Sequence, residues 1–191
     1  GGSLTALPII ETQANDISAY IPTNVISITD GQIFLDAELF NEGQRPAVNV
    51  GLSVSRVGGA AQKPVMKKIS ASLRTRLAQY RELAEFMQFG SDIDDETRKT
   101  LASGRLLTEA LRQPRYAPVE DALQTILIFA VSEGFADKIS PDTMEDFEKD
   151  LYKYFRQKKT ELISEIAATR KFDDELKNSL REALGEFVAR S

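Results

Sequence analysis

Residues 48–59 read Val48-Asn49-Val50-Gly51-Leu52-Ser53-Val54-Ser55-Arg56-Val57-Gly58-Gly59. The β-branched residues in the first part predict a strand over 48–55 that delivers Arg56 to its carboxyl end and breaks at the two glycines. Ligands of open α/β sheets bind beyond the carboxyl ends of the strands, so an arginine placed there can reach a phosphate group. An arginine that closes a strand is more often solvated or half of a surface ion pair. The position of Arg56 alone therefore leaves both interpretations open.

Composition narrows the chemistry that the chain can perform. The chain has 191 residues, is 42% hydrophobic and carries a net charge of −5. This balance allows a real core and argues against non-specific binding of nucleic acid. The chain has no cysteine and no histidine, which excludes disulfides, thiolate metal sites and triads of the serine–histidine type. The groups left for binding or catalysis are arginine, carboxylates, hydroxyls and backbone amides.

The sequence carries no signal for a membrane segment. No stretch approaches the roughly 18 apolar residues that a spanning helix needs, and the start lacks the basic region of a signal peptide. We therefore expect a soluble chain that reaches a membrane only through partner proteins.

The chain changes character near residue 64. Before this point, turn residues and β-branched residues predict strands over 8–11, 25–29 and 48–55, with a tight turn at Asp30-Gly31 and a short helix over 36–42 that Gly43 ends. After Pro64, apolar residues at intervals of three and four predict one long helix over 66–87. Further helices are expected at about 94–103, 105–112, 118–133, 141–156, 160–170 and 173–189, with Gly104 and Gly134 as C-terminal stops and Ser140-Pro141 as a helix start.

Longer strings of residues carry a family resemblance. They are Ile21-Pro22-Thr23-Asn24-Val25-Ile26-Ser27-Ile28-Thr29-Asp30-Gly31-Gln32-Ile33-Phe34-Leu35, together with residues 2–13, 45–50, 53–59 and 78–83. These strings closely resemble the α subunit of F-type ATP synthases, and the resemblance covers essentially the whole chain. It implies a mixed α+β, mostly α fold. The last strands of a RecA-like P-loop nucleotide-binding domain would occupy residues 1–63, and an all-α helical bundle domain would occupy residues 64–191.

The predicted strands do not complete such a nucleotide-binding domain. Three strands and a short helix cannot close a doubly wound sheet, and the phosphate-binding loop Gly-x-x-x-x-Gly-Lys-Ser/Thr is absent from the sequence. We therefore expect the chain to be a C-terminal piece of a longer subunit, inactive by itself.

The resemblance also assigns candidate catalytic residues. It makes Arg56 an arginine finger that the α subunit inserts into the catalytic site of the adjacent β subunit. Ser53 and Ser55 flank this arginine as supporting residues, and Ser27 occupies a family position that faces the same interface. Without the resemblance, the serines would be interpreted as ordinary strand residues.

A second set of residues concerns a non-catalytic nucleotide. Arg45, Pro46 and Gln113 match family positions that line an adenine pocket, where Arg45 could stack on the base and Gln113 could offer both a donor and an acceptor. The match departs at Arg115, where relatives commonly carry glutamine. From the residues alone, Gln113-Pro114 is equally well explained as a helix end before a loop.

The cofactor implied is ATP or ADP with Mg²⁺, whose protein ligands would lie upstream of Gly1, so we expect no metal site within the chain. The implied partners are the β subunit in an alternating hexameric ring, the γ subunit of the central stalk and the peripheral stalk with the δ subunit. Residues 89–96 would face the central stalk, although an acidic run after a glycine usually only caps the next helix. No nucleic acid and no direct membrane insertion are expected. The location implied is the cytoplasmic face of the bacterial plasma membrane, or the equivalent organelle membrane, as a peripheral protein.

The resulting hypothesis is a regulatory, non-catalytic nucleotide-binding subunit that assists ATP synthesis and hydrolysis coupled to proton transport. Two alternatives stay open. A stand-alone helical interaction module would give Arg56 no function. A hexameric RecA-type RNA-dependent ATPase would need basic, aromatic loops that contact RNA, which the acidic C-terminal region does not favour.

Overall fold

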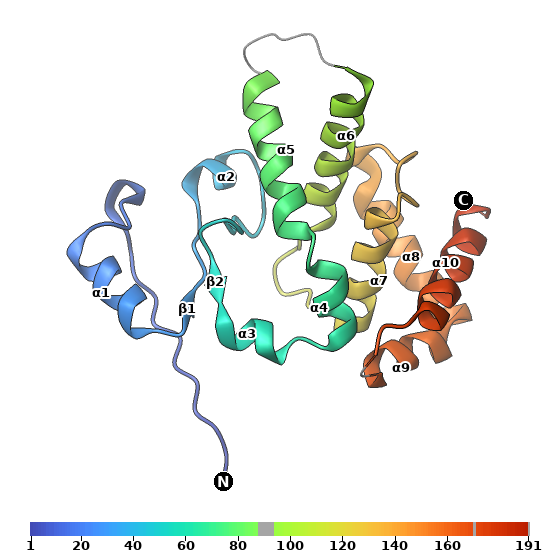
Figure 1. Cartoon of the computed structure of the whole chain (residues 1–191), viewed down its shortest axis with the longest axis horizontal. Coiled ribbons are helices and arrows are strands. Elements are labelled where there is room, and N and C mark those ends of the chain that lie inside the picture. The colour runs from blue at the N-terminus through green and yellow to red at the C-terminus, as the bar shows by residue number, and fades with distance from the viewer. Residues whose placement is uncertain (88–93, 170, 191) are drawn as a thin grey trace. The chain divides into compact units, whose positions relative to one another are not determined.

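The computed structural model describes residues 1–87, 94–169 and 171–190. The chain divides into two compact units, Gly1–Ala60 and Ala61–Ser191, and each is described by itself. Helices account for most of the regular structure, and the described residues form a single sheet, which has two strands (Figure 1).

The first unit is built around a short antiparallel pair of strands. Its elements are η1 (Gln13–Asn15), α1 (Tyr20–Ile28), β1 (Gly31–Gln32), α2 (Ala37–Asn41), β2 (Val54–Ser55) and the start of α3 (Arg56–Ala61). In the register of the pair, Gly31 lies opposite Ser55 and Gln32 opposite Val54. A further antiparallel bridge joins Leu35 to Val48. The unit is therefore held together by a few backbone pairings.

The short helix predicted over 36–42 is confirmed as α2. The carboxylate of Asp36 caps its N-terminus by accepting a 2.9 Å hydrogen bond from the Glu38 amide. Gly43 follows the helix with φ +87°, a left-handed conformation that favours glycine. The local signals at both ends of this helix were sufficient to define it.

The three predicted strands are wrong in most of their length. Residues 8–11 have no regular secondary structure, residues 25–28 lie in α1, and only Val54–Ser55 of the 48–55 stretch is a strand. A strand needs a neighbour to take its backbone hydrogen bonds, whereas a helix satisfies them locally. The side chain of Asn49 also closes a turn, because its Oδ1 accepts hydrogen bonds from the amides of Gly51 (3.0 Å) and Leu52 (3.2 Å). This turn explains why β2 begins only at Val54.

The second unit is an all-α assembly. It contains α4 (Pro64–Ser70), α5 (Leu73–Met87), α6 (Asp95–Ala110), α7 (Asp121–Ser132), η2 (Pro141–Thr143), α8 (Met144–Lys158), α9 (Thr160–Ala168) and α10 (Asp174–Val188). Helix α7 is the most buried, since every residue from Leu123 to Val131 except Gln124 is buried, and it packs against α4, α6, α8 and α9. The rings of Phe147 on α8 and Phe187 on α10 meet edge to face, with centroids 5.5 Å apart.

The apolar stripes read from the sequence are confirmed as core. Met144, Phe147, Leu151 and Phe155 of α8 are buried, and so are Leu176, Leu180, Ala183, Leu184 and Phe187 of α10. Gly134 ends α7 with φ +84°, as predicted. The single helix predicted over 66–87 is instead two helices, α4 and α5, separated at Ala71-Ser72. Ser70 and Ser72 flank Ala71, and serine is a weaker helix former than alanine or leucine.

The prediction that Gly104 ends a helix is wrong. Helix α6 runs unbroken from Asp95 to Ala110, so the helices predicted over 94–103 and 105–112 are one. Gly104 is buried, and a Cβ built on it would lie 2.5 Å from both Cβ and Cγ of Tyr80 on α5. The glycine is there because α5 and α6, which lie side by side in Figure 1, cross too closely for a side chain.

We expect Gly104→Ala to lower the free energy of unfolding by about 1–3 kcal/mol, because the helices must move apart. The matched control is Gly185→Ala on α10, where nothing lies within 4 Å of the new Cβ and the better helix former should add up to about 1 kcal/mol. Urea denaturation followed by circular dichroism measures both variants. Equal stability of the two would contradict the close crossing of α5 and α6.

Candidate functional site

Arg56 lies at the junction between a strand and a helix. It follows β2 directly and is the first residue of α3. Because Gly31 pairs with Ser55, Asp30 lies next to Arg56, and the Arg56 Nε donates a 3.3 Å hydrogen bond to the Asp30 carbonyl oxygen. The Arg56 side chain is exposed, and in the described part of the chain no carboxylate forms a salt bridge with it. Its charge is therefore available to an external ligand.

Glycines keep this junction compact. A Cβ on Gly31 would overlap the Val54 carbonyl oxygen, and a Cβ on Gly58 would overlap the Ser55 hydroxyl. The strand does end before Gly58-Gly59, as predicted, and both glycines lie inside α3. The close approaches at Gly31 and Gly58 bring β1 against β2 and the first turn of α3 against Ser55, on either side of Arg56.

The three candidate serines have different surroundings. The Ser53 hydroxyl is half-buried, donates to the Asn49 carbonyl (2.6 Å) and accepts from the Phe34 amide (3.0 Å), so it ties the 49–53 turn to the segment after β1. Ser55 is exposed on β2 beside Arg56. Ser27 lies on α1 and not on a strand, and its hydroxyl donates to the Asn24 carbonyl at 2.7 Å. Only Ser53 and Ser55 share the segment that carries Arg56.

Arg45 and Pro46 follow α2 in the first unit. The Arg45 guanidinium lies 3.5 Å from the centroid of the Phe40 ring, and its Nη1 donates to the carbonyl oxygens of Phe40 (2.5 Å) and Gln44 (2.9 Å). The peptide bond between Arg45 and Pro46 is cis. One face of the guanidinium is therefore occupied by Phe40, and stacking on a base would use the other face.

Gln113 and Arg115 lie in the second unit, in the segment between α6 and α7. The Gln113 Nε2 donates to the Ala117 carbonyl at 3.3 Å, which leaves its side-chain oxygen available as an acceptor. The Arg115 Nη2 donates to the Tyr116 hydroxyl at 3.0 Å, and its guanidinium lies 5.1 Å from the centroid of that ring. Both side chains are exposed, so they are accessible to a ligand from solvent.

The acidic segment over 89–96 lies partly outside the described residues, since 88–93 are not among them. Asp94 is described, and it caps α6 by accepting a 2.7 Å hydrogen bond from the Thr97 amide. This hydrogen bond lowers the pKa of the Asp94 carboxyl below its ordinary value. The expected helix cap is therefore present at Asp94.

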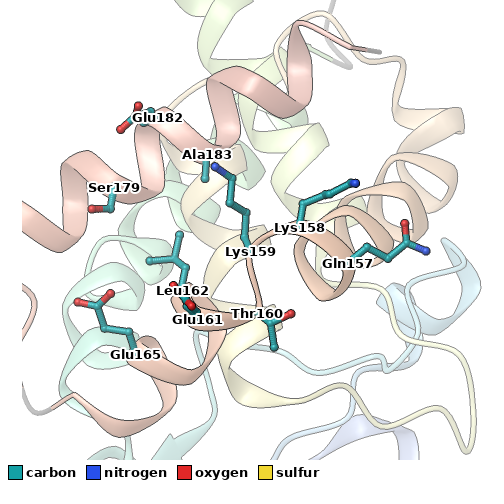
Figure 2. A pocket seen from close by; sticks show the side chains of 10 residues that line it. All are labelled: Gln157, Lys158, Lys159, Thr160, Glu161, Leu162, Glu165, Ser179, Glu182 and Ala183. Atoms are coloured by element: carbon teal, nitrogen blue, oxygen red, sulfur yellow. The ribbon is translucent and has the colours of Figure 1, made fainter.

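A polar hollow of about 640 Å³ lies where α8, α9 and α10 meet (Figure 2). Lys158 and Lys159 line it together with three carboxylates, those of Glu161, Glu165 and Glu182. The Lys159 ammonium is engaged, because its Nζ lies 2.9 Å from Oε1 of Glu186, whose Oε2 accepts a 2.8 Å hydrogen bond from the Tyr154 hydroxyl. Sequence patterns gave no sign of this hollow, and its mixture of charges selects no class of ligand.

Two glutamates on α8 have pKa values shifted in opposite directions. Glu148 is half-buried, and this burial raises its pKa, although a hydrogen bond with Tyr152 opposes the shift. Glu145 is exposed and lies 2.6 Å from Lys149, whose hydrogen bond lowers the pKa of Glu145. The ionised form is thus disfavoured by the fold at Glu148 and favoured at Glu145.

We expect Glu148→Gln to stabilise the chain at pH 7, and this gain should vanish as the pH falls below about 4. A raised folded pKa means that ionisation at neutral pH lowers the free energy of unfolding, whereas below the pKa values of both states the group has no effect. Glu145→Gln should have the opposite effect. It should slightly lower the free energy of unfolding at pH 7, and this difference should disappear as the pH falls through the lowered pKa of Glu145. Urea denaturation of both variants between pH 3 and pH 7 measures this, and shifts of the same sign would contradict it.

Two classes of feature are absent from the described residues. No group of three or more acidic, cysteine or histidine side chains there is placed to hold a metal ion. No described helix is both long and apolar enough to cross a membrane.

Comparisons with known proteins give the family. Residues 62–187 match the family described as ATP synthase alpha/beta chain, C terminal domain, and residues 1–55 match ATP synthase alpha/beta family, nucleotide-binding domain. The chain is 56% identical over 188 residues to ATP synthase subunit alpha of Actinobacillus succinogenes, which covers 98% of this chain and 37% of that protein. The ATP synthase subunit alpha of Petrotoga mobilis is 54% identical over 187 residues, with the same two coverages.

The subunit alpha of Lactobacillus delbrueckii subsp. bulgaricus is 55% identical over 189 residues, 99% of this chain and 37% of that protein. The chain thus spans a little over a third of the length of the relatives it matches. The mostly helical second unit fits the C-terminal domain of that family. The matches to both parts of the chain show that it belongs to the ATP synthase alpha/beta family, with ATP synthase subunit alpha among its similar relatives.

Proposed function

We propose that this chain acts as part of an ATP synthase α subunit and supplies Arg56 to the nucleotide site of a neighbouring subunit during ATP synthesis and hydrolysis. The observation that carries the proposal is the exposed guanidinium of Arg56 at the end of β2, held by one backbone hydrogen bond and paired with no carboxylate of the described residues. In this proposal the neighbour is a β subunit in an alternating ring, as the family resemblance implies.

The chemistry required of Arg56 is stabilisation of charge. In phosphoryl transfer, negative charge spreads over the equatorial oxygens of the transferred group. A planar guanidinium can donate to two of these oxygens at once, and it stays protonated throughout. The hydrogen bond from Nε to Asp30 orients the side chain and leaves both terminal nitrogens of the guanidinium free to donate.

The serines support this arrangement in the proposal. Ser53 braces the turn before β2 through its two hydrogen bonds. The side chain of Ser55 is small, so it would let β2 beside Arg56 approach a partner closely. Ser27 is assigned a place on the same interface by the family resemblance, and its position on α1 makes it the most peripheral of the three.

A non-catalytic nucleotide, ATP or ADP with Mg²⁺, is the cofactor of the proposed subunit. For recognition of adenine, Arg45 with Pro46 in the first unit would offer the free face of the Arg45 guanidinium. In the second unit, considered by itself, Gln113 with Arg115 would offer the free side-chain oxygen of Gln113. The described residues contain no cluster of carboxylates for Mg²⁺, so we assign its coordination to none of them.

The proposed assembly determines partners and location. The neighbours are the β subunit in the ring, the γ subunit of the central stalk and the δ subunit of the peripheral stalk. Through these partners the chain would lie at a membrane as a peripheral protein, on the cytoplasmic face in a bacterium. The ring would couple the nucleotide reaction to proton transport.

A chimera tests the function directly. Residues 1–191 replace the matching segment of the Actinobacillus succinogenes subunit alpha, whose sequence is 56% identical there, and the chimera is expressed with the other subunits of that complex. We expect an assembled complex that hydrolyses ATP at a rate comparable with that of the native complex. A complex that assembles without turnover would contradict the catalytic proposal, and failure to assemble would contradict the proposed partners.

A further inference from the structure

A second hollow, of about 290 Å³, lies between α5 and α6 in the second unit. Helix α5 contributes Arg76 and Gln79, which are one turn apart, and α6 contributes Lys99, Thr100, Ser103 and Gly104. Its lining therefore holds two cations and no carboxylate, although the chain as a whole carries a net charge of −5. We infer that this hollow, named here the α5–α6 crevice, binds a small tetrahedral oxyanion such as phosphate.

The hydrogen bonds of Arg76 orient its guanidinium within the crevice. Its Nη2 donates to Ser103 Oγ at 2.7 Å, and its Nη1 reaches the Ser132 carbonyl oxygen at 3.5 Å. A guanidinium has five N–H donors, so three are left for a ligand. Arg76 is half-buried, where a charge-assisted hydrogen bond is screened less by water than on an open surface.

The hydroxyls and the amide of the crevice differ in what they offer to an anion. Ser103 Oγ accepts from Arg76, so its own proton is free to be donated to a ligand. Thr100 donates its proton to the Glu96 carbonyl at 3.1 Å and offers only lone pairs, so it lines the crevice without binding an anion. The amide of Gln79 adds two further donors.

Lys99 completes the set with a second positive charge. It is exposed and forms no salt bridge with any described residue. Lys99 and Ser103 are four residues apart on α6, so they project from the same face of the helix. The crevice thus presents two charges and several neutral donors from two helices, which is the donor set that recognises an oxyanion. This inference does not depend on the proposed role of Arg56.

The test is a titration of the 191-residue chain with inorganic phosphate at constant ionic strength, followed through backbone amide chemical shifts. We expect saturable shifts at Arg76, Gln79, Lys99 and Ser103 in the millimolar range, and none when chloride replaces phosphate. A parallel titration with ADP distinguishes free phosphate from phosphate carried by a nucleotide. Shifts that do not saturate, or that chloride reproduces, would overturn the inference.

Variants assign the binding to the crevice. Arg76→Gln should weaken phosphate binding about tenfold or more, because it removes charged hydrogen bonds. Since Arg76 also holds Ser103, Lys99→Gln provides an exposed substitution that leaves the fold untouched and should weaken binding about fivefold. The control is Arg98→Gln, a neighbouring cation that pairs with Asp95 at 3.7 Å and does not line the crevice. If Arg98→Gln weakens binding as much as Lys99→Gln does, only general surface charge is involved and the proposed site is wrong.

Discussion

Replacement of Arg56 by alanine or by lysine is expected to abolish steady-state ATP turnover in the assembled complex, while nucleotide binding is preserved. An arginine that stabilises the charge of a transferring phosphoryl group contributes about 10³–10⁵ in rate. Lysine keeps the charge but presents it as a point on a flexible chain, so it cannot replace a two-pronged donor. The two substitutions should therefore lower ATP turnover by similar factors. This result would show that the shape of the guanidinium matters, because lysine retains the positive charge.

The structure favours Arg56 as a residue whose loss affects the reaction more than the fold. Its side chain makes one long hydrogen bond to a backbone carbonyl and is otherwise exposed. The matched control is Val57→Ala, the next residue of α3, whose side chain is 63% exposed and should be neutral in both assembly and turnover. Turnover is measured by coupled ATPase assay and binding by titration with a fluorescent nucleotide. A variant at Arg56 that retains more than about a tenth of the normal rate would contradict the arginine-finger role.

The helical unit was largely predictable because its determinants are local. Two features show this: the buried apolar residues of α8, which are Met144, Phe147, Leu151 and Phe155, and the helix end at Gly134. Each depends only on residues within one or two helical turns. Gly104 shows the limit of this reasoning, since its role is set by Tyr80 on another helix. A glycine that permits a close crossing cannot be told from one that ends a helix when only neighbours in sequence are considered.

The first unit was predicted poorly for the opposite reason. The stretch 25–29 has the composition of a strand, but a strand depends on neighbours that the described residues do not supply, and the segment is helical instead. The placement of Arg56 at a strand end is confirmed, because that strand is paired. Its hydrogen bond to Asp30 follows from a register between residues 26 positions apart, which no local pattern specifies.

In the 191-residue chain, amides in the core of the second unit are expected to exchange with solvent at least about a thousandfold more slowly than amides in the first unit. The slowest amides should lie in α7 and α8, whose apolar faces are buried. Amides of α1, β1 and β2 should exchange close to the rate of an unfolded chain. The reason lies in burial, because Ala47 is the one buried hydrophobic residue in 1–60 apart from Pro22.

Exposed apolar side chains in the first unit support the same expectation. Leu4, Ile9 and Ile28 are 98%, 96% and 82% exposed, so folding this part removes little apolar surface from water and gains little free energy. A chain reduced to residues 61–191 should keep the protection of α7 and α8 and a melting temperature within a few degrees of the full chain.

The substitution Leu151→Ala, at a fully buried position in α8, should instead lower the free energy of unfolding by about 2–5 kcal/mol and reduce that protection.

The opposite result would point to a specific cause. Both β1 and β2 have only two residues, and an isolated pair of strands is marginal in water unless its edges or faces are covered. If the amides of β1 and β2 proved as protected as those of α7, a second copy of the chain pairing with these edges would be the first explanation. Protection would then rise with protein concentration, whereas protection that arises within one chain does not depend on it. Concentration-independent protection of β1 and β2 would show that residues 1–60 are stable in the single chain, which would contradict a lower stability of the first unit.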